Sequence, residues 1–160
     1  KLMKNARRNE KSMNSRPERQ REILRKSRKN MARPNNPEKA IGEILSEVGI
    51  KCKFLQDVSY RTLDNKPVSK EMDIVWKDSM GNKKIIEYNG RFHFDPREHK
   101  PEEIHEVHNK PTKCQDIWDK ENMILKQIRK EGWKILVVWQ LDFLKELDKT
   151  TKKILKFAKS

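Results

Sequence analysis

The sequence contains few cysteines and no long apolar segment. Only Cys52 and Cys114 are present, too few for a disulfide scaffold, so a reducing cytosol suits the chain. No apolar run approaches the roughly 20 residues that are needed to span a bilayer. No signal peptide is recognisable either. These absences argue against a membrane protein and against a disulfide-rich secreted protein, and we expect a cytoplasmic location.

Apolar residues are scarce relative to charged ones. Of the 160 residues, 34% are hydrophobic and 39% are charged, and the net charge is +14. This length suffices for one domain with a core but not for two. So polar a composition also indicates that part of the chain stays outside the core. An excess of positive charge says most about partners, and polyanions such as nucleic acids are the first to consider.

The positive charge is concentrated near the N-terminus. Residues 1–33 contain 13 Lys and Arg against 3 Glu, a net charge of +10, and the other 127 residues carry the remaining +4. We therefore divide the chain into a basic DNA-binding arm or linker, 1–35, and a folded domain, 36–160. The alternative for the arm is a solvated tail without a specific partner. If the arm binds DNA, its cationic side chains should contact the phosphates. We expect such contacts from Arg7, Arg8, Arg16, Arg19, Arg21, Arg25, Lys26, Arg28, Lys29 and Arg33 of the arm, and from Arg91 of the folded domain.

Periodicity in the first half of the folded domain predicts one helix and three strands. The helix, from about 37 to 48, follows Asn36 as a suitable N-cap. Alternating apolar residues predict a strand at 50–54, and further strands are expected at 72–76 and 84–88. Turn-forming residues separate the last two strands, which should therefore form an antiparallel hairpin.

The second half of the domain begins with a long loop. Residues 89–111 are rich in His, Pro and charge, and a loop of this length is usually functional or disordered. A helix at 112–131, a strand at 133–139 that is buried on both faces, and an amphipathic helix over 143–155 complete the domain. The order of helix, three strands, helix, strand and helix favours an α/β fold in which helices cover the faces of a small mixed sheet.

Asp73 lies within an otherwise apolar strand, where an acid needs an explanation. It is either a surface residue on a half-exposed strand or a metal ligand. The predicted hairpin favours a ligand, because it places Asp73 opposite Glu87 to Asn89, and opposed residues lie about 5 Å apart on one face. Carboxylates and a backbone carbonyl are oxygen ligands that Mg²⁺ prefers. Such a metal would polarise a phosphodiester, activate water and orient both.

Two further residues are candidates for catalysis. His93 follows the third strand, and its unperturbed pKa of about 6.5 suits a general base, although a single His is often structural. Glu38 lies in the first turn of the first helix, where it could join the site. Acids also favour that turn because of the helix dipole, and Glu43 on the same helix is the rival acid.

His99, His105, His108 and Cys114 raise the question of a zinc site. Zinc takes four nitrogen or sulfur ligands at short spacings. The sequence has no CxxC pair, and a charged, flexible loop collects His readily. From the sequence alone we therefore do not expect zinc.

Three segments of the chain resemble one nuclease family. The most specific segment is Leu125 to Trp139, where a helix runs into the strand GWKILVVW. The second is IIEYNGRFHF, and the third runs from Ser27-Arg-Lys-Asn-Met through Ala40-Ile to the Gly-Ile that ends the first helix. Together they resemble the very short patch repair endonucleases and their phage homing relatives with an EDxHD motif, over residues 28 to about 142.

The resemblance implies a fold and an activity. The fold would be the PD-(D/E)xK, restriction-endonuclease-like one. The activity would be metal-dependent hydrolysis of DNA phosphodiester bonds with Mg²⁺, or another divalent cation such as Mn²⁺, by the catalytic domain of a site-specific homing endonuclease. The protein would bind double-stranded DNA and would not bind a membrane. If a phage encodes it, it would act in the cytoplasm of a bacterial host. Cutting both strands would favour a homodimer on DNA or two successive nicks.

The resemblance also implies roles for individual residues. Asp73 takes the position of the metal-binding Asp, and Tyr88 takes a position that contributes its backbone carbonyl to the metal. Glu87 matches the second acid of the broader nuclease pattern. His93 lies at or next to the general base, and Glu38 matches a helical Glu that acts through water or a second ion.

The chain departs from the family pattern at several positions. Asn89 stands where the repair enzymes have His and other relatives often have Asp, and Asn cannot act as a base. The final Asp of the motif has three candidates, Asp95, Asp116 and Asp119. The zinc ligands of the repair enzymes are not reproduced. The alternatives are therefore a non-catalytic or inactivated DNA-binding module of the same fold, which Asn89 favours, and a structure-selective resolvase.

Overall fold

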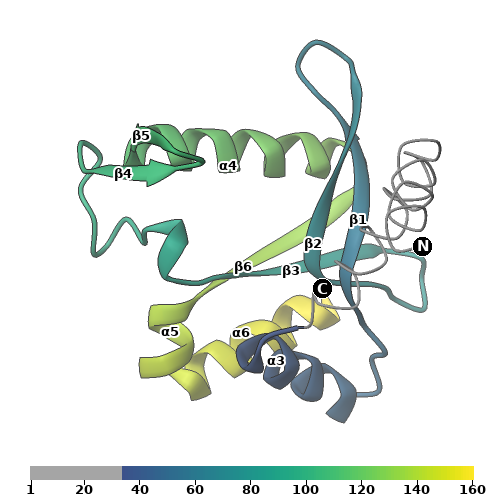
Figure 1. The fold of residues 1–160 in the computed structure, drawn as a ribbon. Coiled ribbons are helices and arrows are strands. Elements are labelled where there is room, and N and C mark those ends of the chain that lie inside the picture. The colour runs from purple at the N-terminus through teal and green to yellow at the C-terminus, as the bar shows by residue number, and fades with distance from the viewer. Residues whose placement is uncertain (1–33) are drawn as a thin grey trace, which may run out of the picture. The chain divides into compact units, whose positions relative to one another are not determined.

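A four-stranded mixed sheet lies at the centre of residues 34–160, the part of the chain that the computed structural model describes (Figure 1). Residues 1–33 of the predicted arm 1–35, which include all its basic residues, lie outside the described residues. The strand order is β1-β2-β3-β6; β2 pairs antiparallel with β1 and β3, and β3 pairs parallel with β6. These strands are β1 (Lys53–Arg61), β2 (Pro67–Lys77), β3 (Lys83–Asn89) and β6 (Trp133–Trp139).

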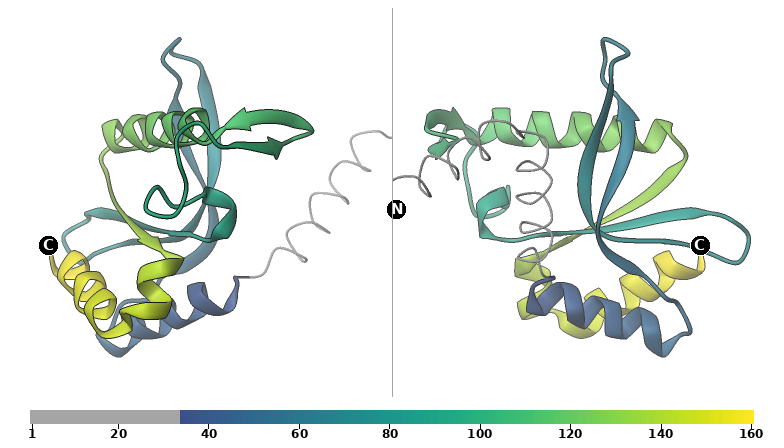
Figure 2. Two further views of the ribbon diagram at one scale, coloured as in Figure 1. Left: turned by 90° about the vertical axis from the view of Figure 1, so that its left-hand side faces the viewer. Right: turned by 45° about the vertical axis from the view of Figure 1, so that its right-hand side comes forward.

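Helices cover both faces of this sheet, as Figures 1 and 2 show. Helix α4 (Cys114–Lys130) lies across one face, and α3 (Asn36–Glu47), α5 (Gln140–Lys145) and α6 (Leu147–Lys159) lie on the other. Each interface has its own apolar core. The core under α3 and α6 includes Ile41, Ile74 and Ile154, and the core under α4 includes Met72, Val75 and Ile128. The expected mixed α/β arrangement with a small sheet is therefore confirmed.

The β2–β3 hairpin was predicted correctly. Its register pairs Ile74 with Ile86 and Val75 with Ile85, and Gly81 occupies the turn with a φ of 82°. Few residues other than glycine adopt that backbone conformation without strain. One further step of the register brings Asp73 opposite Glu87, so a local turn aligns the two acids.

The expectation of an irregular segment at 89–111 is wrong. This segment contains the short 3₁₀ helix η1 (Arg91–His93) and a separate two-stranded antiparallel sheet, β4 (Ile104–Val107) with β5 (Lys110–Lys113). Each strand of this sheet has only four residues, and few of them are apolar, so no period-two pattern marks it in the sequence.

Four other boundaries differ from the sequence prediction. Strand β1 begins after Cys52 and extends to Arg61, so that most of it was missed. Its partner β2 is longer than expected at both ends. The N-cap of α3 is Asn35, whose side chain accepts the Glu38 N–H, rather than Asn36. The C-terminal segment forms two helices instead of one, because the chain turns out of helical geometry at Glu146.

Strand β6 is not buried on both faces. It is the edge strand of the sheet, Lys134 is exposed, and Val138 is its only buried residue. Its apolar run is nevertheless explained by the two cores, because Leu136 packs beneath α3 and α6 and Ile135 packs beneath α4. None of the helices in the described residues is long and apolar enough to cross a membrane.

Lys84 joins the sheet to the end of α6. Its side chain is fully buried, and its Nζ donates to the carbonyl oxygens of Phe157, Ala158 and Ser160 at 3.1, 2.8 and 2.7 Å. The Asp78 carboxylate lies 3.7 Å away. These carbonyls belong to the last turn of a helix, where most carbonyls lack an intrahelical donor, although the Phe157 carbonyl also accepts the Ser160 N–H. The ammonium group therefore caps the helix C-terminus, where a positive charge is favourable.

We predict that Lys84→Met destabilises the fold by about 2 kcal/mol or more, because a hydrogen-bonding cation is lost and the buried Ala158 carbonyl loses its side-chain donor. Urea denaturation measures the free energy of unfolding. Lys77→Met, at the exposed end of β2, is the matched control and should be close to neutral. Equal stability of the two variants would contradict the capping role of Lys84.

Candidate active site

Asp73 and Glu87 are joined by reciprocal hydrogen bonds at the point where β2 leaves β3. The Asp73 N–H donates to Glu87 Oε1 at 2.9 Å, and the Tyr88 N–H donates to Asp73 Oδ2 at 2.8 Å. Each carboxylate thus takes a backbone donor from the other strand and is fixed in direction by it. The predicted opposition of Asp73 and Glu87 is confirmed, and the Tyr88 main chain lies at the same place.

Strand β2 loses its regular alternation at Asp73. Met72 and Ile74 would share a face in a regular strand, yet they belong to the cores on opposite sides of the sheet. On β1, Leu55 lies opposite Asp73 and has a φ of 51°, a conformation that is strained for a branched side chain. Backbone strain of this kind concentrates at functional sites. The distortion turns the Asp73 carboxylate towards the Tyr88 N–H instead of into either core.

Burial raises the pKa of both carboxyl groups. Glu87 is only 5% exposed, and burial, together with the adjacent Asp73, raises its pKa from 4.5 to about 7. Burial likewise raises the pKa of Asp73, against the Tyr88 N–H and the positive charges of Lys70 and His93. The Lys70 ammonium is 3.9 Å from Glu87 Oε2 and is a weak partner at that distance. A buried acid beside a half-buried one, with so little cationic compensation, favours a further positive charge between them.

Glu38 faces the same cluster from α3. It is 7% exposed, burial raises its pKa, and Asp73 and Glu71 raise it further. Its Oε2 also accepts the Asn35 N–H at 2.8 Å and completes a capping box. The capping role and proximity to the other acids therefore coexist. The rival acid, Glu43, is exposed on α3.

His93 is held by an acid that the sequence did not indicate. Its Nδ1 lies 2.9 Å from Glu121 Oε1, on α4. This hydrogen bond raises the pKa of His93 against the effect of burial, and the charges of Glu87 and Asp73 raise it further. With Nδ1–H donating to Glu121, the lone pair of the neutral ring lies on Nε2. His93 and Glu121 thus form an acid–histidine pair within electrostatic range of the two sheet carboxylates.

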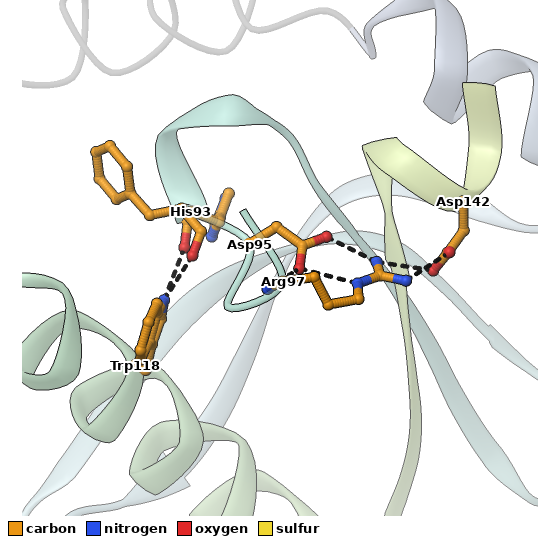
Figure 3. A network of polar contacts seen from close by, with 6 residues as sticks. His93, Asp95, Arg97, Trp118 and Asp142 are labelled. Atoms are coloured by element: carbon orange, nitrogen blue, oxygen red, sulfur yellow. Dashed lines mark hydrogen bonds and ion pairs between the residues drawn. The ribbon is translucent and has the colours of Figure 1, made fainter. Parts of the chain in front are cut away.

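The three candidates for the final Asp of the motif have other hydrogen-bond partners or are exposed. Asp95 binds Arg97, whose guanidinium also reaches Asp142 of α5 (Figure 3), and Arg97 holds the pKa of Asp95 below its usual value. Asp119 accepts from Gln115 at 2.8 Å, and Asp116 is exposed in the first turn of α4. A signal for Glu121 was present, since it interrupts the apolar stripe of α4 that carries Trp118, Ile124 and Leu125.

Trp118 fixes the chain directly after the His93 side chain. Its indole points from α4 at this loop (Figure 3), and Nε1 donates to the Phe94 carbonyl at 2.7 Å and lies 3.3 Å from the His93 carbonyl. Phe94 has a φ of 53°, so the chain turns sharply just after His93. Helix α4 therefore positions His93 in two ways: Glu121 binds the imidazole ring, and Trp118 binds the main chain beside it.

Asn89 lies beside this cluster, in a separate cavity. The cavity has a volume of about 230 Å³ and is lined by Asn89, Arg91, His99 and Gln140 among others, but not by Asp73 or Glu87. Asn89 is 8% exposed, at the end of β3 opposite Trp139. A direct role for Asn89 in catalysis stays a prediction. Arg91 is exposed, with its guanidinium 4.6 Å from the centre of the Phe92 ring.

A comparison with known families, curated proteins and solved structures finds no match to this chain.

We predict that without divalent cations the protein becomes less stable as the pH rises from about 4.5 to 7. The raised pKa of Glu87 means that the folded state keeps a proton that the unfolded state releases in this range. Glu38, Asp73 and His93 also have raised pKa values, which act in the same direction. The share of Glu87 is at most about 3 kcal/mol.

Denaturation at several pH values in the presence of a chelator measures this slope. Glu87→Gln should flatten it, whereas Glu106→Gln, which removes an exposed carboxylate of β4, should leave it unchanged. Equal slopes for the wild type and Glu87→Gln would show that Glu87 is not held protonated in the fold.

Proposed function

We propose that this chain is a metal-dependent DNA endonuclease of the PD-(D/E)xK fold, whose acids lie on the β2–β3 hairpin. The observation that carries the proposal is the convergence of a buried carboxylate, Glu87, and a half-buried one, Asp73, with the His93–Glu121 pair. The combination provides oxygen ligands for a hard cation and a base beside them. The resemblance to very short patch repair and homing nucleases supports the same reading, with a DNA substrate.

The residues present fit a magnesium ion. Asp73, Glu87 and the Tyr88 carbonyl would hold it, with Glu38 as a further acid on α3. The fit rests on the chemistry of the donor set, because two carboxylates that hydrogen bonds hold beside each other and a main-chain carbonyl are oxygen ligands that magnesium prefers. Bound there, Mg²⁺ would stabilise negative charge on the phosphodiester and lower the pKa of water.

His93 is suited to accept the proton of the attacking water. Its Nδ1 is engaged by Glu121, so that Nε2 is the nitrogen free to take a proton. The Glu121 carboxylate then stabilises the imidazolium. Trp118 holds the loop so that the ring does not need to be ordered when substrate binds.

An exposed cation and an exposed aromatic ring lie next to His93 in η1. Arg91 and Phe92 precede His93, and Phe92 is 73% exposed. Arginine suits phosphate contacts, and an exposed ring offers a stacking surface to a base. Together with the +10 charge of residues 1–33, they indicate a nucleic-acid substrate. A non-catalytic DNA-binding module is the alternative, and plasmid nicking with and without Mg²⁺ distinguishes the two.

We predict that Asp73→Asn abolishes cleavage while it leaves folding and DNA affinity nearly intact. Loss of a ligand carboxylate removes several kcal/mol of transition-state stabilisation, about 10³-fold in rate, without removing volume from a core. Nicking rates, melting temperatures and gel-shift affinities measure the three properties. Asp57→Asn, at an exposed position of β1, is the matched control. A fully active Asp73→Asn protein would refute the assignment.

We predict that Glu121→Gln lowers the nicking rate and moves the ascending limb of its pH profile to lower pH. The reason is that Glu121 raises the pKa of His93, and a base with a lower pKa becomes neutral at lower pH. A loss of orientation alone would lower the rate without the shift. Asp116→Asn, on the same helix, is the control and should change neither quantity. An unshifted profile in Glu121→Gln would argue against His93 as the base.

We predict that deletion of residues 1–33 weakens DNA binding and flattens its dependence on salt. Each phosphate contact that is lost reduces the slope of log K against log salt by about 0.9. Binding measured at several salt concentrations gives this slope. An unchanged slope would mean that the basic segment is a passive tail. Nicking by the shortened chain at low salt tests separately whether the folded domain contains the active site.

A further inference from the structure

A second group of ligand atoms converges between η1 and the β4–β5 hairpin. His99 Nδ1 lies 2.8 Å from Glu103 Oε2, and His105 Nε2 lies 3.4 Å from the same oxygen. The ligand atoms of the three residues all lie within 4.8 Å of one another, which no other set of three His, Cys or acidic residues achieves in the described part of the chain. Ligands of a tetrahedral zinc ion lie about 3.3 Å apart, given bonds of about 2.0–2.2 Å, so this spacing suits one ion.

The rings are held in place before any ion is bound. The Phe94 ring stacks on His105, with centroids 4.0 Å apart and planes 16° apart, and it meets His99 edge-on at 5.4 Å. Glu103 Oε1 accepts the Lys100 N–H at 2.9 Å, which leaves Oε2 for the two imidazoles. That N–H and the His99 ring thus hold the two oxygens of the Glu103 carboxylate in direction.

The segment that carries these residues lacks an apolar core. Between Tyr88 and Cys114 no hydrophobic side chain is buried, and Ile104 in β4 is 62% exposed. An isolated hairpin of two short strands is marginally stable in water. Structures without a sufficient core are usually stabilised by a disulfide or a metal. The two cysteines of the chain are free, so no disulfide holds this segment, and apart from the Arg97–Asp142 ion pair a metal ion would be its cross-link.

We propose that His99, Glu103 and His105 bind one zinc ion, which fixes the segment between η1 and α4. Two imidazole nitrogens and one carboxylate oxygen form a donor set that zinc accepts and that magnesium, which prefers oxygen alone, does not. The His99, Glu103 and His105 side chains are 29%, 36% and 32% exposed, so an ion can enter and a water can complete four-fold coordination. The sequence prediction against zinc weighed only His and Cys, and it overlooked Glu103.

The zinc site shares no residue with the proposed site of cleavage. Its effect on that chemistry would pass through Phe94, which follows His93 and whose carbonyl is bound by Trp118. Zinc would therefore order the loop that presents the base, while magnesium would be held by different residues on the sheet. Zinc content is measured without DNA, so that a failure of the nuclease proposal leaves this test intact.

The experiment uses the full chain without a polyhistidine tag. The protein is stripped with a chelator, dialysed and titrated with Zn²⁺, and bound metal is measured by atomic emission. We expect one equivalent of zinc and a melting temperature that rises by several degrees at about 100 times the dissociation constant. Co²⁺ in place of zinc should give the visible absorption of a four-coordinate site. Mg²⁺ should produce neither effect.

Four variants assign the ligands. His99→Asn, His105→Asn and Glu103→Gln should each weaken zinc binding about 100-fold or more and abolish the thermal shift. His108→Asn is the matched control, because His108 lies outside the triad in a turn with a φ of 50° that Asn tolerates. Asp73→Asn should also keep its zinc.

Three results would overturn the proposal. No zinc above trace levels would leave the cluster as a hydrogen-bonded His–Glu–His group only. Zinc that survives in His99→Asn and His105→Asn would belong to other ligands, such as the free thiols. Equal loss in His108→Asn would mean non-specific binding to surface imidazoles.

Discussion

The two backbone-to-carboxylate hydrogen bonds between β2 and β3 are the interaction on which the candidate active site depends. Each one uses a main-chain N–H at the end of the strand ladder, where no neighbouring strand remains to accept it. The acids therefore satisfy the backbone and are oriented by it. Removal of either acid leaves a buried donor without a partner, so the geometry of one carboxylate depends on the other. Burial and the adjacent Asp73 raise the pKa of Glu87 to about 7, and the proton that Glu87 thus keeps limits the repulsion between the two groups.

The parts of the fold that the sequence predicted are local. The hairpin between Met72 and Tyr88 follows from two apolar runs and a turn at Gly81, and the facing of Asp73 and Glu87 follows from its register. Strand Trp133–Trp139 follows from an apolar run that begins after a helix-ending glycine. In each case the signal lies within a few residues of the feature that it predicts, so no knowledge of the tertiary fold was needed.

The parts that were missed depend on contacts between distant segments. Glu121 is one acid among several on a charged helix, and only the packing of α4 against the loop after β3 brings it to His93. The β4–β5 hairpin has no apolar alternation, because polar contacts rather than a core hold it. The second half of β1 has one fully buried side chain, Val58, so that its pattern resembles that of a surface loop.

The parallel pairing of β3 with β6 has a consequence for the order of folding. The β2–β3 hairpin closes through a short turn, whereas β3 meets β6 only after the chain has passed through η1, β4, β5 and α4. Contacts between residues that are far apart in sequence carry a larger loop-closure cost and form slowly. The two carboxylates are thus brought together early by a local contact. His93 meets Glu121 only after α4 has packed against the loop that follows β3. During synthesis, the contact between Asp73 and Glu87 therefore requires only the chain up to β3, whereas the contact between His93 and Glu121 requires α4 as well.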